Sequence, residues 1–258
     1  MDFYRNENEN KQSVTFTDDQ SAAIDELISF IAATWSDKDF IRGLCGPGGT
    51  GKTFVTKYII ENCKYSHSVI KCTAPTHKAC RVLSNSIGNI RNVETIQSTF
   101  GLRLDLKLED FDPERPQFNP IAGPKLDNIK LLIIDEASML PAKLVKYIIN
   151  TCKKLNIKII FQGDSFQLPP VGEKQSYAFT QCYKTNYLNE IIRQGNDNPI
   201  RDILNILRED IKNKTYRFLE FIYKNRNKYF YNDINEGFFV CDVNKFKELV
   251  DKSFLDEE

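Results

Sequence analysis

The sequence predicts an α/β fold in which helices cover both faces of a parallel sheet. Three observations indicate this fold. Runs with strand character alternate with helical patterns from residue 17 to about residue 161, as crossover connections between parallel strands require. The run L-L-I-I at 131–134 is apolar at every position, which is typical of a strand buried on both faces. A glycine-rich loop at 46–53 leaves one predicted strand and enters a predicted helix.

The first half of the alternation is regular. Residues 17–34 carry apolar side chains at helical spacing behind Thr17, a favourable N-cap residue, and predict an amphipathic helix. The pattern then predicts a strand, a helix, a strand and a helix, at 40–45, 52–63, 68–73 and 77–86.

Segment 104–128 interrupts this alternation. It holds four Pro and many charges with little periodicity, which predicts a small inserted subdomain or a functional loop. The alternation resumes with the strand at 131–134, a helix at 141–154 and a strand at 157–161. We therefore expect a polar tail at 1–13, one lobe over 14–200 with this insert, and a helical and basic connector over 201–258. This connector is expected to be irregular around 224–240, and its strand-like G-F-F-V at 237–240, followed by a predicted helix from Val243, resembles the start of a truncated second lobe.

Composition limits the class of protein. The chain has 258 residues, a length that suits one large α/β domain. Lys and Arg total 35, and Asp and Glu also total 35, so the formal net charge is zero. This balance argues against a protein coated in basic charge for non-specific nucleic-acid binding, although a local basic groove is compatible with it.

Cysteine usage and hydropathy indicate a compartment. Seven Cys occur without a C-x-x-C pair, which predicts reduced thiols rather than a disulfide framework or a zinc ribbon. No apolar run approaches the roughly 18 residues of a membrane span, and the polar start is no signal peptide. We expect a cytoplasmic protein, or one at a nucleoid or viral replication site, with no membrane partner.

The loop G-P-G-G-T-G-K-T at 46–53 fits the pattern G-x-x-x-x-G-K-[ST]. Glycines let backbone N–H groups close on phosphate oxygens, and the following helix adds its positive end. Lys52 is expected to reach the β- and γ-phosphates of ATP, and the Thr53 hydroxyl to bind Mg²⁺. The remaining loop residues expected to hold nucleotide are Gly48, Gly49, Thr50 and Gly51. The alternative is an ordinary glycine-rich turn.

Acidic and polar residues end two further strands. Asp135 and Glu136 follow L-L-I-I, where open α/β sheets place ligands, so Asp135 is a candidate Mg²⁺ ligand and Glu136 a candidate general base. The alternative is a pair of solvated charges. In I-I-F-Q-G-D-S-F-Q-L-P-P-V at 159–171, Gln167 is suited to contact a γ-phosphate or its water, and Asp164 is either functional or a turn residue.

Five segments together resemble superfamily 1B DNA helicases of the RecD and PIF branch, over roughly 14–200. They are the loop at 46–53, A-P-T-H-K-A, T-I-Q-S, I-I-D-E-A-S and G-D-S-F-Q-L-P-P. The resemblance implies a P-loop NTPase with a RecA-like sheet. It also implies that Gln20 reads adenine and that Arg193 contacts the γ-phosphate.

The resemblance implies a single-stranded DNA partner as well. The residues that match the two strand-binding motifs of the family are Thr76, His77, Lys78, Thr95, Gln97 and Phe100. Gln97 stands where the family usually has His, and Phe100 is either a base-stacking platform or core. Segment 104–128 lies where the family inserts a subdomain, with Phe111 and Phe118 as candidates for splitting the duplex.

The function that the resemblance implies is the ATP-hydrolysing lobe of a 5′-to-3′ DNA helicase that translocates on single-stranded DNA. Such motors need a second RecA-like lobe, for which the residues after 200 are too few. We therefore expect either a truncated form of a longer protein or an isolated first lobe. Two alternatives are a P-loop ATPase that acts as a switch or loader without translocation, and a structural protein that keeps a nucleotide fold.

Overall fold

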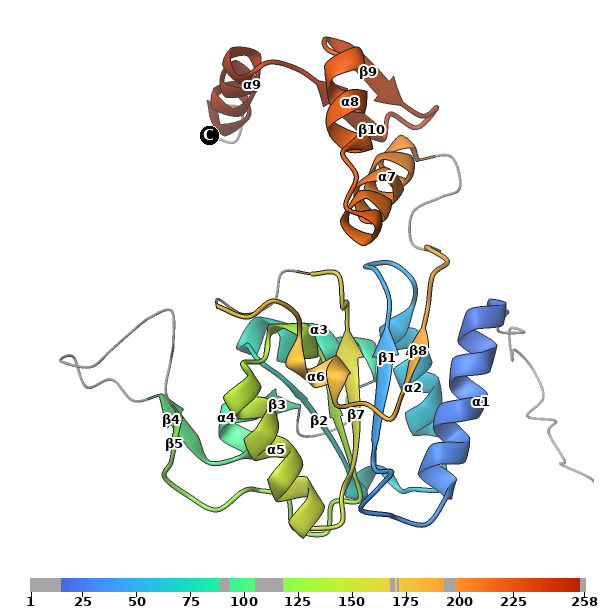
Figure 1. Cartoon of the computed structure of the whole chain (residues 1–258), viewed down its shortest axis with the longest axis vertical. Helices are drawn as coiled ribbons and strands as arrows, with labels where there is room; N and C mark the ends of the chain where they lie inside the picture. Colours follow the sequence, from blue (N-terminus) through green and yellow to red (C-terminus); the bar gives the residue numbers. More distant parts are fainter. Residues whose placement is uncertain are drawn as a thin grey trace, which may run out of the picture. The chain divides into compact units, whose positions relative to one another are not determined.

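The computed structural model describes residues 15–88, 93–104, 118–167, 170, 172–192 and 198–255 (Figure 1). The chain divides into two compact units, Met1–Ile191 and Ile192–Glu258. The predicted tail at 1–13 lies outside the described residues.

The first unit is built on a six-stranded sheet in which every pair of neighbours is parallel. The strand order is β3-β2-β6-β7-β1-β8. The strands are β1 (Ile41–Cys45), β2 (Ile70–Ala74), β3 (Glu94–Thr95), β6 (Leu131–Ile134), β7 (Lys158–Gly163) and β8 (Lys184–Tyr187). The four central strands are buried at every position, which confirms the predicted parallel sheet.

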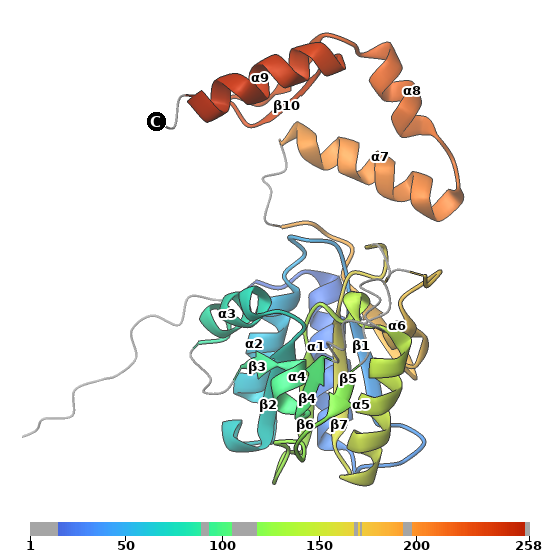
Figure 2. The ribbon, with the colours of Figure 1, turned by 90° about the vertical axis from the view of Figure 1, so that its left-hand side faces the viewer.

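Helices cover both faces of this sheet, as Figures 1 and 2 show. One core cluster joins the sheet to α1 (Asp18–Ala32), α2 (Lys52–Asn62) and α3 (His77–Ser86). The cluster on the opposite face joins it to α4 (Ile96–Thr99), α5 (Ala142–Lys154) and α6 (Tyr177–Thr180). Alternate residues of β6 point to opposite clusters, because side chains along a strand alternate between faces. Two short 3₁₀ turns are η1 (His67–Val69) and η2 (Ala137–Met139).

The start of α1 confirms the predicted N-cap. The Thr17 hydroxyl accepts a hydrogen bond from the Gln20 backbone N–H, and the Gln20 side chain accepts one from the Thr17 N–H, both at 3.2 Å. This capping box satisfies two N–H groups that a helix start leaves without partners. It also fixes the position of the Gln20 side chain in the first turn of α1.

Part of the predicted insert is a small antiparallel ribbon. Its strands are β4 (Leu102–Leu104) and β5 (Phe118–Pro120). The segment that follows β5 is joined to the end of α4 by a backbone hydrogen bond of 2.8 Å from Lys125 N to Thr99 O. Phe111 lies outside the described residues, and the Phe118 side chain is not described.

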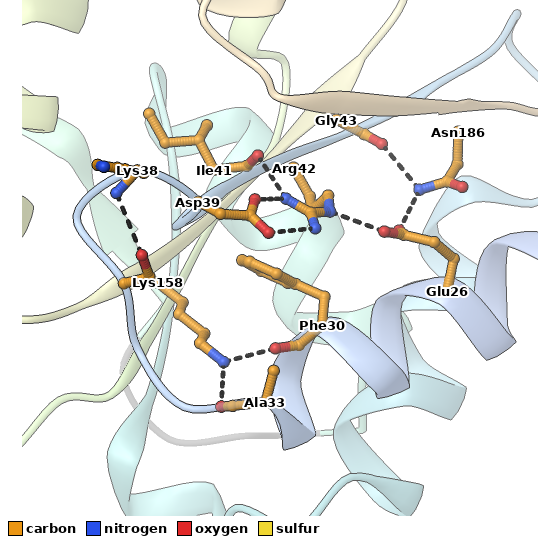
Figure 3. Close-up of polar contacts among 11 residues, drawn as sticks. Glu26, Phe30, Ala33, Lys38, Asp39, Ile41, Arg42, Gly43, Lys158 and Asn186 are labelled. Atoms are coloured by element: carbon orange, nitrogen blue, oxygen red, sulfur yellow. Dashed lines mark hydrogen bonds and ion pairs between the residues drawn. The ribbon is translucent and has the colours of Figure 1, made fainter.

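A partly buried ion-pair cluster joins the middle of α1 to the start of β1 (Figure 3). Arg42 donates from Nε to Glu26 Oε1 at 2.7 Å and from both terminal nitrogens to Asp39. The bond from Arg42 lowers the pKa of the Asp39 carboxyl. The other oxygen of Glu26 accepts from Asn186 of β8 at 2.8 Å. Glu26 therefore connects α1, β1 and β8.

A buried lysine closes the C-terminal end of α1. Lys158 is 1% exposed, and its ammonium donates to the carbonyls of Phe30, Ile31 and Ala33, the last at 2.6 Å (Figure 3). These carbonyls belong to the last turn, where a helix has acceptors without partners and partial negative charge. Burial lowers the pKa of Lys158 to about 8.

We expect Glu26→Ala to destabilise the first unit by about 3 kcal/mol, because it leaves the buried Arg42 cation with only one carboxylate partner. Lys57→Ala is the matched control, since the Lys57–Glu61 pair is exposed and such pairs contribute about 0–1 kcal/mol. Urea unfolding followed by the fluorescence of Trp35, the single tryptophan, measures both. Equal midpoints for the two variants would contradict the assigned role of Glu26.

The second unit consists of α7 (Pro199–Asn213), α8 (Arg217–Lys224), β9 (Lys228–Tyr231), β10 (Gly237–Val240) and α9 (Val243–Leu255). The prediction of irregular structure around 224–240 is wrong for β9, which pairs with β10 as an antiparallel hairpin. The expected strand at 237–240 and the expected helix from Val243 are confirmed as β10 and α9. The rings of Phe230 and Phe238 stack at 4.9 Å, and Phe221 packs against both. The rings of Tyr229 and Phe239 also stack across the two strands, at 4.0 Å, and aromatic cross-strand pairs of this kind stabilise a two-stranded ribbon.

Among the residues that the structure describes, no helix is long and apolar enough to cross a membrane.

Candidate active site

The glycine-rich loop connects β1 to α2 at the edge where the parallel strands end. Gly46 donates to Gly163 O at 3.1 Å, so the start of the loop is tied to the end of β7. Gly49 and Gly51 have φ angles of 85° and 84°, in the left-handed region that favours glycine. A Cβ on Gly51 would lie 2.5 Å from Gln20 Nε2, whereas one on Gly48 would meet nothing within 4 Å. Gln20 of α1 therefore packs against the loop at Gly51, whereas the loop is open at Gly48.

Lys52 is the first residue of α2, and its ammonium contacts the backbone of the glycine-rich loop. Nζ donates to Gly46 O at 2.7 Å and to Pro47 O at 3.0 Å. Burial lowers the pKa of Lys52, and the charges of Asp164, Glu136 and Asp135 oppose that shift. The ammonium is therefore held by two backbone carbonyls, which phosphate oxygens can replace, and three carboxylates act on its charge. Thr53 lies half-buried next to it in the first turn of α2.

Asp135 and Glu136 follow β6 on the same edge of the sheet. Asp135 Oδ1 accepts from Glu136 N at 3.0 Å and from Gln162 Nε2 at 2.9 Å. Burial raises the pKa values of both carboxyl groups, and the charge of Asp135 raises that of Glu136 further. Glu136 has a φ of 51°, an uncommon conformation for a residue with a side chain that is often found at functional sites.

The polar loop after β7 reaches the same region. Gln167 Oε1 accepts from Ser138 Oγ at 3.4 Å, and Gln167 N donates to Asp164 O at 3.1 Å. Asp164 is 7% exposed, and its carboxylate accepts from Phe166 N at 3.0 Å. Asp164 therefore forms the turn that the sequence suggested as one of two alternatives, and its charge also acts on Lys52.

Gln20 contacts the glycine-rich loop from α1, and its residue surface is 1% exposed. Its Nε2 donates to Thr50 O at 3.0 Å, while its Oε1 accepts from Thr17. Thr50 is also buried and donates from its hydroxyl to Pro47 O at 2.9 Å. Both ends of the Gln20 amide are engaged with protein, so the residue supports the loop in this structure. Reading adenine stays a prediction for Gln20.

The first predicted strand-binding motif lies at the start of α3. Thr76 caps this helix, and its hydroxyl accepts from Ala79 N at 3.2 Å. Thr76, His77 and Lys78 are exposed. Because β2 is parallel to the other strands, this turn lies at the same edge of the sheet as the glycine-rich loop.

The second motif is largely buried. Phe100 is fully buried, and its ring packs at 6.1 Å from that of Tyr147. The prediction of Phe100 as a base-stacking platform is therefore wrong, and the core alternative is correct, because an apolar ring gains more from the core of the α5 face than from water. Thr95 is 8% exposed and caps α4 by accepting from Ser98 N at 3.2 Å. Gln97 is half-buried.

Sequence reasoning missed two polar side chains of this site. Gln162 and Ser138 are fully buried, and they contact Asp135 and Gln167 respectively. The sequence did hold a signal for Gln162, because an amide directly after the apolar run I-I-F is expected to be buried with the strand. A buried amide needs a hydrogen-bond partner. Arg193 lies outside the described residues, so its contact with a γ-phosphate stays a prediction.

The sheet, the glycine-rich loop and the strand-end carboxylates define a P-loop NTPase with a RecA-like lobe. The chain belongs to the AAA domain family, whose model matches residues 15–222. It is distantly related to the Dda, Pif1 and RecD2 helicases of superfamily 1B over much of its length, which confirms the resemblance seen in the motifs.

An uncharacterized protein of Methanocaldococcus jannaschii is 28% identical over 76% of this chain and 18% of its own length. The ATP-dependent DNA helicase dda of Enterobacteria phage T4 is 32% identical over 67% of this chain and 38% of its own length. Among solved structures, the Pif1 helicase from Candida albicans aligns with a TM-score of 0.49 and 23% identity over 76% of this chain and 44% of that chain. The chain therefore spans less than half the length of these relatives.

Proposed function

We propose that this chain is the ATP-hydrolysing lobe of a DNA helicase that translocates 5′-to-3′ on single-stranded DNA. One observation supports this most strongly. Lys52, Asp135 and Glu136 meet at one edge of the sheet, and the exposed turn at Thr76–Lys78 begins at that same edge. Binding of nucleotide at the loop and binding of DNA at this turn would therefore take place at the same edge of one sheet.

The proposed chemistry assigns a separate role to each group. Lys52 would exchange the carbonyls of Gly46 and Pro47 for phosphate oxygens as the triphosphate enters. Glu136 would accept the proton of the attacking water, from a site next to Lys52 where its position is set by the left-handed turn. Gln167, linked to Ser138, would orient that water or the γ-phosphate.

The oxygen donors present fit Mg²⁺, which prefers carboxylate, hydroxyl and phosphate oxygens and keeps several waters. Asp135 and Thr53 would hold the ion. Among the described residues no cluster of three or more His, Cys, Asp or Glu side chains is placed to bind a metal, so the nucleotide would supply the other oxygens. Bound Mg²⁺ neutralises charge that develops on the β- and γ-phosphates.

The DNA part of the proposal is tested at α3. We expect Lys78→Ala to weaken binding of an oligo-dT strand severalfold. The dependence of the logarithm of the binding constant on the logarithm of the salt concentration is expected to become less steep, by about the amount that one phosphate contact contributes. Lys57→Ala, an exposed lysine on α2, is the control. An unchanged salt slope for the Lys78 variant, measured by fluorescence anisotropy, would count against strand binding at this turn.

The direction of movement rests only on the resemblance of the motifs to the helicase family. A protein that carries this lobe and a second one is expected to unwind duplexes with a 5′ single-stranded overhang. Unwinding only from a 3′ overhang would refute the proposed polarity.

A further inference from the structure

Gln162 occupies a position in the sheet that is costly for an amide. It lies in β7, between β6 and β1, and none of its surface is exposed. Ile159, Ile160 and Phe161 before it are apolar and buried, so an apolar residue here would continue the strand without cost. Burying an amide in such surroundings is unfavourable by several kcal/mol unless its hydrogen bonds are made.

Both ends of the Gln162 amide are used, and the partners lie on elements that carry the candidate nucleotide site. Its Oε1 accepts from the hydroxyl of Thr56, which is itself 2% exposed. Its Nε2 donates to Asp135 Oδ1 at 2.9 Å. Thr56 lies on α2, one turn beyond Thr53, and Asp135 ends β6. The amide therefore forms a bridge from the helix that follows the glycine-rich loop to the carboxylate across the sheet.

This bridge has a consequence for the orientation of Asp135. Oδ1 receives two hydrogen bonds, from Gln162 and from the Glu136 N–H. Among the hydrogen bonds that the structure describes, none reaches Oδ2. Two donors on one oxygen fix the rotation of the carboxyl group and leave the second oxygen for a ligand. Partners that orient a metal-binding carboxylate in this way commonly change metal affinity on the order of 10–100-fold when they are removed.

We infer that Gln162 is a positioning residue of the nucleotide site, which holds Asp135 ready for Mg²⁺ and couples its orientation to α2 through Thr56. This inference rests on the proposed ATP-binding function. It assigns a role to a residue outside the glycine-rich loop and outside the D-E pair. It also predicts that the bridge acts on the Mg²⁺-dependent part of nucleotide binding, and that the contacts of the loop with phosphate are independent of it.

The test is the affinity for ADP, measured by calorimetry on the 258-residue chain with Mg²⁺ and with a chelator. Gln162→Met keeps the length of the side chain and removes both hydrogen bonds. We expect the affinity of this variant in chelator to stay within about twofold of wild type, while the gain in affinity that Mg²⁺ provides falls about tenfold.

Three further variants separate positioning from packing. Thr56→Val removes one end of the bridge and is expected to reduce the Mg²⁺-dependent gain in the same direction, whereas Thr56→Ser keeps the hydroxyl and the wild-type gain. The double variant Gln162→Met/Thr56→Val is expected to be no worse than Gln162→Met, because the two act as one unit. Thr73→Val is the matched control and is expected to keep the wild-type gain, since the buried Thr73 hydroxyl of β2 has no hydrogen-bond partner among the described residues.

A wild-type Mg²⁺-dependent gain in Gln162→Met would overturn the inference. So would an equal loss of affinity with and without Mg²⁺, since that result marks a residue that only maintains the fold. A wild-type chain that binds ADP under neither condition would instead overturn the proposed function itself. The comparison of wild type with variant therefore distinguishes the two failures.

Discussion

Lys52→Ala is expected to reduce the affinity for ATP at least a hundredfold, which corresponds to about 3 kcal/mol. The reason is that Lys52 is the cation at the loop whose carbonyl partners can be replaced by phosphate oxygens. Removing it takes away a charge-assisted hydrogen bond in a partly buried site and leaves the negative charges that act on Lys52 without this opposing charge. Calorimetric titration with a non-hydrolysable ATP analogue measures the loss.

The control for this variant is Lys57→Ala, which removes an exposed lysine one turn further along α2. Its affinity for the analogue is expected to match that of the wild type. Unfolding of both variants followed by Trp35 fluorescence shows whether the fold is retained. Tight analogue binding by a folded Lys52→Ala protein would remove the basis for the phosphate site.

Glu136→Gln is expected to retain nucleotide binding and to lose hydrolysis by a factor of about 10²–10⁴, which is the usual contribution of a general base. The amide has the shape of the carboxylate and tolerates the same backbone, but it cannot accept the proton of water. The left-handed φ of 51° at this residue is kept in the variant, so the geometry of the following η2 turn is expected to persist.

Single-turnover hydrolysis in a protein that carries this lobe and a second one measures this effect separately from product release. Glu61→Gln removes an exposed carboxylate of α2 and is the matched control. Near-wild-type turnover by Glu136→Gln would exclude Glu136 as the base and make Asp164, a buried carboxylate whose charge acts on Lys52, the next candidate.

The central part of the fold could be predicted because its strands are apolar runs. The run L-L-I-I is β6 to the residue, and the predicted strands at 40–45 and 157–161 differ from β1 and β7 by one or two residues at their ends. The strands at the two edges of the sheet, β3 and β8, were missed. β8 has the sequence K-T-N-Y and is partly exposed along its length, so it lacks the apolar pattern that identifies a strand.

The site could be predicted as far as local sequence specifies it. The glycine-rich loop and the D-E pair are contiguous motifs whose chemistry follows from their order in the chain. The bridge from Thr56 through Gln162 to Asp135 joins residues 106 and 27 positions apart, and only the folded sheet brings them together. Phe100 shows the converse, since its neighbours in the sequence match a strand-binding motif but the fold places its ring in the core.

The most direct test of the proposed function is ATP hydrolysis with and without single-stranded DNA. It would be measured for the 258-residue chain and for the same chain followed by a second RecA-like lobe. We predict that turnover appears with both lobes present and that single-stranded DNA stimulates it. Hydrolysis by the 258-residue chain alone, at a rate that DNA does not change, would contradict the helicase account and support an ATPase switch.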